Sequence, residues 1–412
     1  MSISTHTLPC GLRIICAPGQ TDVVYCGIAI DGGTRHELDS ESGMAHFTEH
    51  MSFKGTLRRS SRQIISTMES VGGDMNAFTG KDETVYYCTF LKQHIARAVD
   101  LLLDITLGST YPQDQMNKEV EVVIDEIESY CDQPADLIYD EFEGLVFPGH
   151  PLGRSILGDA ERLRQYRSDD MQQFARRLYR PERMVLYVMG DVRPERVIRL
   201  AEQAVARYDL PPSVMLSALM ASAPQGQALP QPPIIRRKDT HQTHVIVGAQ
   251  SFGGNDPRHL HMYFLINILG GPAMSSRLNM ALRERNGLVY TVESSHATYT
   301  DAGMWCVYFG CDNADARRCL RLVDKELQRL TDAPMSQRAL DAARRQLKGQ
   351  IGVSYDNFEN VAIGMAKRYL HYGKVQTQEE LFARLDRLTP EDLQKTAQEV
   401  FAPEKRLTLE YV

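Results

Sequence analysis

The sequence predicts an α+β protein built from two halves of similar size, and three observations lead to this prediction. The 412 residues exceed what one hydrophobic core usually supports, so two or three domains are expected. A proline-rich stretch at 209–233 interrupts the periodic segments on either side, as an interdomain linker does. Each half, 1–208 and 234–412, shows strand clusters separated by runs of helix rather than strict alternation of strand and helix.

The first half contains four predicted strands. In LRIICAP (12–18) and VVYCGIAIDGG (23–33), β-branched and aromatic residues run up to Pro or Gly, which is typical of strands that end at a turn. TVYYCTFL (84–91) and MVLYVMG (184–190) have the same composition. Helical periodicity lies between these segments, at 41–53, 60–71, 93–107, 113–131, 160–167 and 170–178.

The second half repeats this kind of order. THVIVGAQSF (243–252) predicts a strand, LVYTVESSHATY (288–299) with GMWCVYFGC (303–311) predicts a hairpin, and RLTLEYV (406–412) predicts a last strand. Helices are expected at 257–269, 274–285, 313–331, 335–351, 357–372, 376–387 and 390–401. Because the two halves have similar length and element order, an internal duplication is a reasonable hypothesis.

Composition and charge argue against several classes of partner. The formal net charge is −7 with acidic and basic residues interspersed, so no basic stripe for nucleic acid is expected. No window approaches the roughly 18 apolar residues of a membrane span. The N-terminal residues lack a basic segment followed by an apolar one, and the eight cysteines form no CxxC pair. We therefore expect a cytoplasmic protein with reduced thiols and no membrane partner.

The segment SGMAHFTEHMSFKGT holds the pattern HxxEH at His46, Glu49 and His50. On a helix of about 100° per residue, Glu49 lies about 60° to one side of His46 and His50 about 40° to the other. Two imidazoles at i and i+4 supply two nitrogen ligands to one zinc ion. Glu49 can hold a carboxylate against the metal's water without binding the metal. The pattern is the inverted counterpart of the HExxH motif of zinc proteases.

The surroundings of the motif favour a helix. Ser40 or Ser42 can cap its start and Gly55 can end it. Its apolar face consists of Met44, Phe47 and Met51. Taken alone, two histidines on an amphipathic helix are more often packing or surface residues than ligands, so the metal interpretation needs a further ligand.

A catalytic zinc takes a third protein ligand and keeps a fourth position open. The helix predicted at 113–131 offers the best candidate, because Glu119 and Glu126, seven residues apart, share the flank of its apolar stripe. That stripe consists of Met116, Val120, Val123 and Ile127. A carboxylate beside a buried face is costly unless it finds a cation or a donor. Glu126 on the zinc, with Glu119 supporting a ligand, meets that need; a solvated acidic face is the alternative.

These segments resemble the pitrilysin or insulinase-type zinc peptidases, in particular the mitochondrial-processing-peptidase-like branch with short bacterial chains. HFTEH is followed 76 residues after His50 by Glu126 in EVVIDEI. The similarity extends to GGTRHE, GGDMNAFTGKDETVYY, FPGHPLGRSILG (147–158) and LGGPAMSSRLNMALRERNGLVY (269–290). The resemblance implies two related α/β-sandwich domains, each an antiparallel-rich sheet with helices packed on it, joined by a linker as half of a clamshell.

The resemblance also implies the roles of the site residues. Zinc would be held by His46, His50 and Glu126, with Glu49 as general base, and Glu119 matches the family's additional acidic residue near the ligand.

In RERNGLVY, Arg283 and Tyr290 match a pair that reaches toward the scissile peptide from the domain opposite the zinc. A guanidinium and a phenol can donate hydrogen bonds to an oxyanion or to the substrate backbone. Spacing alone favours a different interpretation, a solvated helix arginine and a strand-edge tyrosine, and the matching context reverses this preference. Because both sets of residues lie on one chain, we expect a homodimer in which this pair of one protomer completes the zinc site of the other.

Asn76, Ala77 and Phe78, followed by Thr84–Tyr87, match the strand that pairs with an extended peptide in relatives. In this mode backbone hydrogen bonds bind the peptide and side-chain pockets select it. A turn leading into a core strand is the alternative reading of NAFTG. Gly80 and Lys81 depart from the Ser or Arg that relatives often have there, which leaves the specificity open.

Together these observations predict a zinc endopeptidase that acts on unfolded peptides held in a closed chamber. Two alternatives stay open: a non-catalytic peptide-binding or scaffold subunit of the same family, and one subunit of a heterodimeric processing peptidase. The intact HxxEH pattern argues against the first of these.

Overall fold

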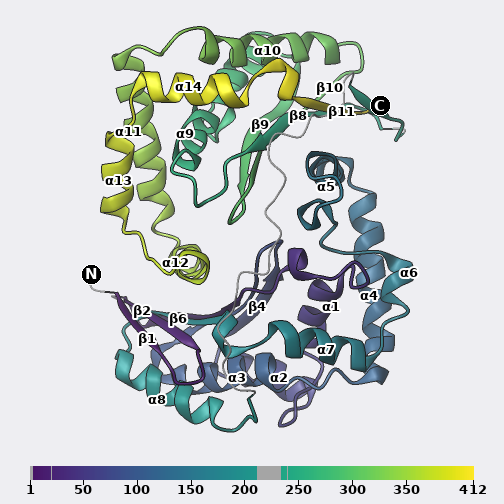
Figure 1. The fold of residues 1–412 in the computed structure, drawn as a ribbon, viewed down its shortest axis with the longest axis vertical. Helices are drawn as coiled ribbons and strands as arrows, with labels where there is room; N and C mark the ends of the chain where they lie inside the picture. The colour runs from purple at the N-terminus through teal and green to yellow at the C-terminus, as the bar shows by residue number, and fades with distance from the viewer. Residues whose placement is uncertain (1–2, 20, 211–232, 239) are drawn as a thin grey trace. The chain divides into compact units, whose positions relative to one another are not determined.

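The computed structural model describes residues 3–19, 21–210, 233–238 and 240–412, which form two compact units (Figure 1). The first unit comprises the described residues of Met1–Ile127, Arg154–Met220 and Tyr355–Gln376. The second comprises those of Glu128–Gly153, Ala221–Ser354 and Thr377–Val412. Each unit therefore takes segments from both predicted domains, 1–208 and 234–412. The predicted linker at 209–233 lies, apart from residues 209, 210 and 233, outside the described residues.

The first unit contains a six-stranded sheet in the order β1-β2-β6-β3-β5-β4. Its strands are β1 (Ser4–Thr7), β2 (Arg13–Pro18), β3 (Val23–Ile30), β4 (Asp74–Thr79), β5 (Thr84–Leu91) and β6 (Met184–Gly190). β2 and β6 run parallel, and every other neighbouring pair is antiparallel. The four strands predicted in this half are confirmed. β1 and β4 are additional strands, in which polar residues obscure the alternation that marks a strand.

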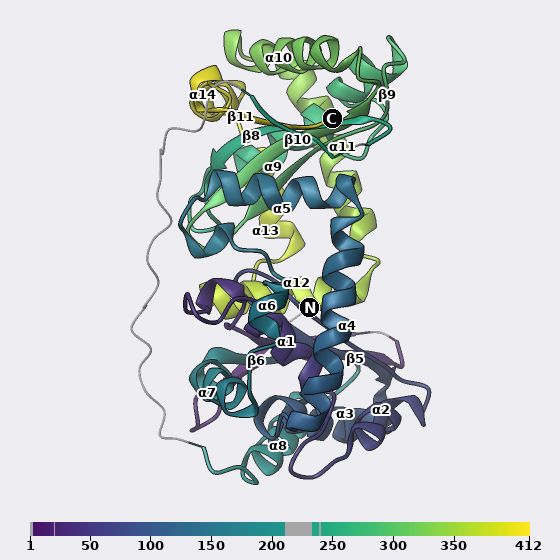
Figure 2. The ribbon, with the colours of Figure 1, turned by 90° about the vertical axis from the view of Figure 1, so that its right-hand side faces the viewer.

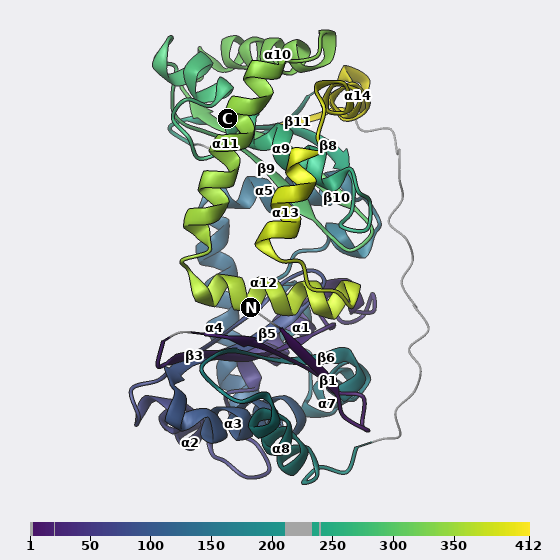
Figure 3. The ribbon, with the colours of Figure 1, turned by 90° about the vertical axis from the view of Figure 1, so that its left-hand side faces the viewer.

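Side chains of the first sheet alternate between two cores. Ile14 and Cys16 face the larger core, whereas Ile15 faces the smaller one. Helices of the larger core are α1 (Met44–Met51), α2 (Ser61–Glu69), α3 (Ile95–Leu107), α4 (Gln113–Cys131), α7 (Ser168–Leu178) and α8 (Pro194–Val205), with the short α6 (Ala160–Leu163) nearby in the chain. The smaller core is closed by α12 (Phe358–Tyr372), whose Ala362 and Ala366 allow close approach to the sheet. Figure 3 shows α12 on one side of this sheet and α2, α3 and α8 on the other.

Ion pairs also attach α12 to the first sheet. His371 Nε2 lies 2.7 Å from Glu83 Oε2, and Lys367 Nζ lies 2.6 Å from Glu83 Oε1. Burial alone disfavours both charges, but the hydrogen bond between them raises the pKa of His371 and lowers the pKa of Glu83. Asp82, the residue before Glu83, pairs with Arg35, whose Nη1 lies 2.9 Å from Asp82 Oδ1. Asp82, Glu83 and His371 are residue types that bind metals, but basic side chains already pair both carboxylates.

Replacing His371 by Gln should lower the free energy of unfolding by about 2 kcal/mol near pH 6 and by less near pH 9. Because the folded pKa of His371 is raised, its contribution is complete below the unfolded value of about 6.5 and is lost as pH rises through the folded value. Glu83 contributes above about 4.3 and loses its contribution as pH falls through its lowered pKa. Urea denaturation at both pH values measures the effect, with the exposed His6→Gln as control. Equal losses at the two pH values would contradict this prediction.

The second unit contains a five-stranded sheet in the order β7-β11-β8-β10-β9. Its strands are β7 (Ile234–Arg236), β8 (Thr243–Ser251), β9 (Val289–Thr298), β10 (Gly303–Cys311) and β11 (Leu407–Tyr411). β7 and β11 are parallel and the other neighbouring pairs are antiparallel. The predicted hairpin is confirmed as β9 and β10. This order and these directions match β2-β6-β3-β5-β4 of the first sheet strand for strand, which supports the hypothesis of an internal duplication.

Helices of the second unit are α5 (Pro134–Val146), α9 (His259–Gly270), α10 (Ala316–Asp332), α11 (Gln337–Ser354), α13 (Gln378–Asp386) and α14 (Pro390–Val400). Figure 2 shows α5 on one side of the sheet and α10 and α14 on the other. Trp305 of β10 is fully buried against Phe401 and donates its indole N–H to Val400 O at 3.1 Å. α5 was not predicted, although its Ile138, Phe142 and Val146 follow helical spacing.

The helix predicted at 274–285 is shorter than expected. The structure has a π-helix, η5, at Asn279–Glu284, because GGPAMSS before it consists largely of residues that favour turns. Across the described part of the chain, no helix combines the length and apolarity that a membrane crossing requires.

Candidate metal centre

Helix α1 carries the HxxEH residues on a buried surface. Met44, Phe47 and Met51 lie in the larger core, as predicted, and His46 and Glu49 are also buried. The predicted serine cap is wrong. Gly43 precedes the helix at φ +79°, and Glu37 accepts hydrogen bonds from the backbone N–H groups of Gly43 and Ala45 at 3.2 and 2.8 Å. Through these two hydrogen bonds, Glu37 takes over the capping role.

The structure brings the three predicted metal ligands together. Glu126 Oε2 on α4 lies 3.8 Å from His46 Nε2 and 3.6 Å from His50 Nε2. One donor atom from each of the three residues lies within 4.8 Å of the other two. Zinc with bonds of about 2.0–2.1 Å in tetrahedral geometry separates its ligand atoms by about 3.3 Å, so the two distances from Glu126 are close to those around a bound ion.

The protonation of His46 also suits a metal. Burial, reinforced by the neighbouring His50, lowers the pKa of His46 to about 3, so its imidazole is neutral and can ligate. The buried Nδ1 of His46 has no hydrogen-bond partner among the described protein atoms. The donor set of two imidazoles and a carboxylate is one that zinc uses in catalytic sites. The residues therefore fit a zinc ion.

Glu119 lies beside one of these ligands, as predicted. His50 Nδ1 lies 3.1 Å from Glu119 Oε1, and Lys54 Nζ lies 2.5 Å from Glu119 Oε2. Burial alone would raise the pKa of Glu119, but hydrogen bonds from His50 and Lys54 outweigh it and lower the pKa. With Nδ1–H donated to this carboxylate, the Nε2 lone pair of His50 is directed to the metal position.

Glu49 has a partner that sequence reasoning missed. Thr79 Oγ1, at the end of β4, donates to Glu49 Oε2 at 2.6 Å. Burial is the main cause that raises the pKa of Glu49, and the acidic Glu126 adds to it. The sequence carries no sign of this contact, because it depends on where β4 lies in the sheet.

The predicted substrate strand is an edge strand. Among the described strands, β5 alone pairs with β4, which carries Asn76, Ala77 and Phe78. Ala77 packs against the larger core and Phe78 against the smaller one, whereas Asn76 is exposed. The strand's outer backbone groups are therefore placed where an extended segment can pair with them.

Arg283 and Tyr290 lie in the second unit, whereas the metal ligands lie in the first. The Arg283 guanidinium, on η5, is 5.6 Å from the centre of the Tyr290 ring at the start of β9. Tyr290 is 82% exposed, so its hydroxyl is open to solvent. The structure thus brings these two residues together as a pair, and their catalytic role remains a prediction.

The chain matches two family descriptions. Residues 14–160 match "Insulinase (Peptidase family M16)", and residues 166–347 match "Peptidase M16 inactive domain". The predicted ligands and Glu49 all fall within the first match, and Arg283 and Tyr290 fall within the second.

Relatives cover nearly the whole chain. It is 31% identical over 411 residues to an uncharacterized zinc protease of Bacillus subtilis, covering 99% of this chain and 98% of the relative. It is 28% identical over 381 residues to the mitochondrial-processing peptidase subunit beta of Lentinula edodes, covering 90% and 81%. A solved protease from Helicobacter pylori has the same fold, with a TM-score of 0.92 at 21% identity over 100% of this chain and 99% of that one. The chain therefore belongs to the insulinase family of peptidases, family M16, in its short bacterial branch.

Proposed function

We propose that this protein is a zinc-dependent endopeptidase that hydrolyses unfolded peptides, with Glu49 as the general base. The observation that carries the proposal is the convergence of His46, His50 and Glu126 beside the buried carboxylate of Glu49. A purely structural cluster would pair this carboxylate with a basic side chain. Among the described residues, its hydrogen bond comes instead from the neutral Thr79.

The residues of this chain divide the chemistry between them. When bound, zinc supplies a Lewis acid that polarises the scissile carbonyl and acidifies water. Glu49, with a pKa raised by burial, accepts the proton of the attacking water and delivers it to the departing amine. Thr79 holds one oxygen of that carboxylate in place. Arg283 and Tyr290 donate to the substrate backbone or to the oxyanion.

The edge position of β4 supports the choice of unfolded peptides as substrates. A peptide must be extended to pair with a strand edge, and a folded domain rarely exposes such a segment. Asn76, Ala77 and Phe78 would present the backbone to it, with alternate side chains on either face of the sheet.

A non-catalytic subunit is the second candidate. The description "inactive domain" for residues 166–347 favours this alternative. A relative that is one subunit of a processing peptidase supports instead the other alternative, in which this chain is one subunit of a heterodimeric peptidase. Against the non-catalytic alternative, all three predicted ligands and the predicted base are present in this chain. The cytoplasmic location and the homodimer, with Arg283 and Tyr290 acting in trans, remain proposals that rest on the sequence.

Cleavage of a mixed peptide library, mapped by mass spectrometry, tests the proposal. The zinc-loaded protein should cut internal bonds, and chelation should lower the rate by at least about 100-fold until zinc is restored. Size-exclusion chromatography of the same sample tests the dimer, since a monomer of full activity would exclude completion in trans. Absence of cleavage by zinc-loaded protein would favour the non-catalytic alternative.

A further inference from the structure

A lysine lies one contact away from the metal ligands and takes no part in the proposed chemistry. Lys54, three residues beyond the end of α1, places Nζ 2.5 Å from Glu119 Oε2. The lysine side chain is 27% exposed and the glutamate side chain 12%. A pair this shielded from solvent is stronger and more oriented than a surface ion pair.

Glu119 uses its two oxygens for two different partners. Oε2 forms an ion pair with Lys54 Nζ, and Oε1 lies 3.1 Å from Nδ1 of His50. On the other side of the imidazole, Nε2 of His50 lies 3.6 Å from Glu126. Glu119 and Glu126 are seven residues apart on α4, about two helical turns, so they lie on the same face of the helix. From this face Glu119 contacts Nδ1 of the His50 ring, and Glu126 lies near its Nε2. The orientation of His50 therefore depends on where the Glu119 carboxylate is held.

The backbone around Lys54 is joined to the segment that leads into α4. Lys54 N–H donates to Met51 O at 3.1 Å, Leu57 N–H to Gly108 O at 2.9 Å, and Thr110 N–H to Gly55 O at 3.1 Å. α4, with Glu119, begins only three residues after Thr110. Between Thr110 and α4, the backbone of Tyr111 has a φ of +50°, a conformation that residues other than glycine rarely adopt.

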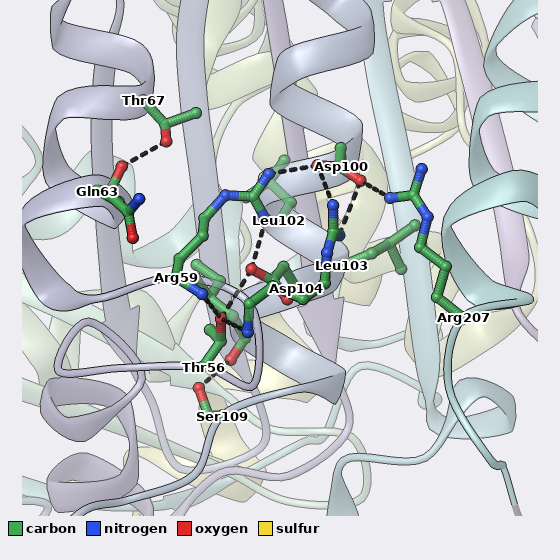
Figure 4. Close-up of polar contacts among 12 residues, drawn as sticks. Thr56, Arg59, Gln63, Thr67, Asp100, Leu102, Leu103, Asp104, Ser109 and Arg207 are labelled. Carbon is green, nitrogen blue, oxygen red and sulfur yellow. Dashed lines mark hydrogen bonds and ion pairs between the residues drawn. The ribbon is translucent and has the colours of Figure 1, made fainter.

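A buried acidic centre anchors the same loop (Figure 4). Asp104 of α3 is fully buried and accepts hydrogen bonds from Thr56 Oγ1 at 2.9 Å and Tyr208 OH at 2.7 Å. Arg59 reaches both Asp104 and Asp100. Thr56 and Arg59 lie in the loop just after Lys54, and their contacts hold this loop in place. The backbone that carries the Lys54 side chain is therefore fixed.

We propose that Lys54 is a positioning residue of the metal centre, which holds Glu119 so that its carboxylate orients His50 for the metal. The inference rests on the proposed zinc site. The ion pair of the lysine is with Glu119, and through this carboxylate it acts on His50. Without it, one oxygen of Glu119 has no cation, and the carboxylate can rotate away from Nδ1 of His50.

The test is the zinc affinity of the purified protein, measured by competition with a chromophoric chelator, which requires no turnover. Lys54→Met should weaken zinc binding by about 10-fold to 100-fold, and Lys54→Arg, which keeps the charge, should stay within about threefold of the unmodified protein. If Lys54 works through Glu119, the double variant Lys54→Met/Glu119→Gln should bind zinc no more weakly than Glu119→Gln alone. The visible spectrum of the cobalt-substituted protein should change in Lys54→Met, since it reports ligand geometry.

Lys348→Met is a matched control, because Lys348 pairs with Asp386 at 2.6 Å with the lysine 25% exposed, far along the chain from the HxxEH motif. It should leave zinc affinity and the cobalt spectrum unchanged. Thermal melting of the zinc-free variants checks that each is folded. An affinity of Lys54→Met within about twofold of the unmodified protein, or losses that multiply in the double variant, would overturn the inference. Because affinity is measured without substrate, an inactive protein would refute the peptidase proposal and leave this result intact.

Discussion

Replacing Glu49 by Gln should lower kcat by roughly 10³-fold while zinc affinity stays within about threefold of its starting value. Glutamine has nearly the same shape, and its amide oxygen can still accept the hydrogen bond from Thr79 Oγ1. It cannot accept a proton from water, so the general-base step is lost. Cleavage of a quenched peptide measures kcat, and chelator competition measures zinc binding.

The exposed Glu69→Gln on α2 is the control for this variant, since it makes the same chemical change away from the ligands. It should cleave at the normal rate. Near-normal cleavage by Glu49→Gln would show that another group removes the proton. Loss of zinc in Glu49→Gln would instead make Glu49 a ligand, contrary to its hydrogen bond with Thr79.

Replacing His50 by Ala should remove most of the bound zinc and, with it, all measurable cleavage. Structural zinc sites bind with about 10–16 kcal/mol shared among four ligands, so one ligand is worth roughly 2.5–4 kcal/mol. That amounts to a loss of affinity of roughly 10²–10³-fold. The variant also leaves Glu119 without the imidazole that it orients. Metal analysis of the protein after dialysis gives the zinc-to-protein ratio.

His6→Ala is the control, because His6 is an exposed histidine on β1. It should retain one zinc per chain. If His50→Ala also retained zinc at this ratio after dialysis, the ligand set of His46, His50 and Glu126 would be wrong. Cleavage that survived the loss of zinc would refute a metallopeptidase altogether.

Much of the fold was predictable because its signals are local. The strands at β2, β3, β5, β6, β8 and β10 have β-branched and aromatic runs that end at turns. The apolar residues of α1 and α4 recur at helical spacing, so their buried faces were predicted correctly. Polar edge strands such as β4, and α5 within an acidic stretch, lack these patterns and become visible only through their packing.

Within the site, the residues that helical spacing places together were predicted, and those that tertiary contacts bring in were missed. His46 and His50 share a face because a helix places i and i+4 together, whatever surrounds it. Glu126 was a candidate because its spacing from Glu119 put both on one flank of a helix. Thr79, Glu37 and Lys54 act through contacts with residues distant in the sequence or outside the helix, and no periodicity reveals them.

By itself, the sequence determined the chemistry available to this protein: two imidazoles and a carboxylate on one helix, an acidic helix after it, and two halves with one order of elements. Helical and strand periods are set by each segment's own backbone and side chains, so they survive without knowledge of neighbours. The tertiary structure decided which carboxylate meets the imidazoles, which threonine holds Glu49, and which helix covers each sheet. Those contacts join segments far apart in the chain, and only the packing of whole elements brings their side chains within hydrogen-bond distance.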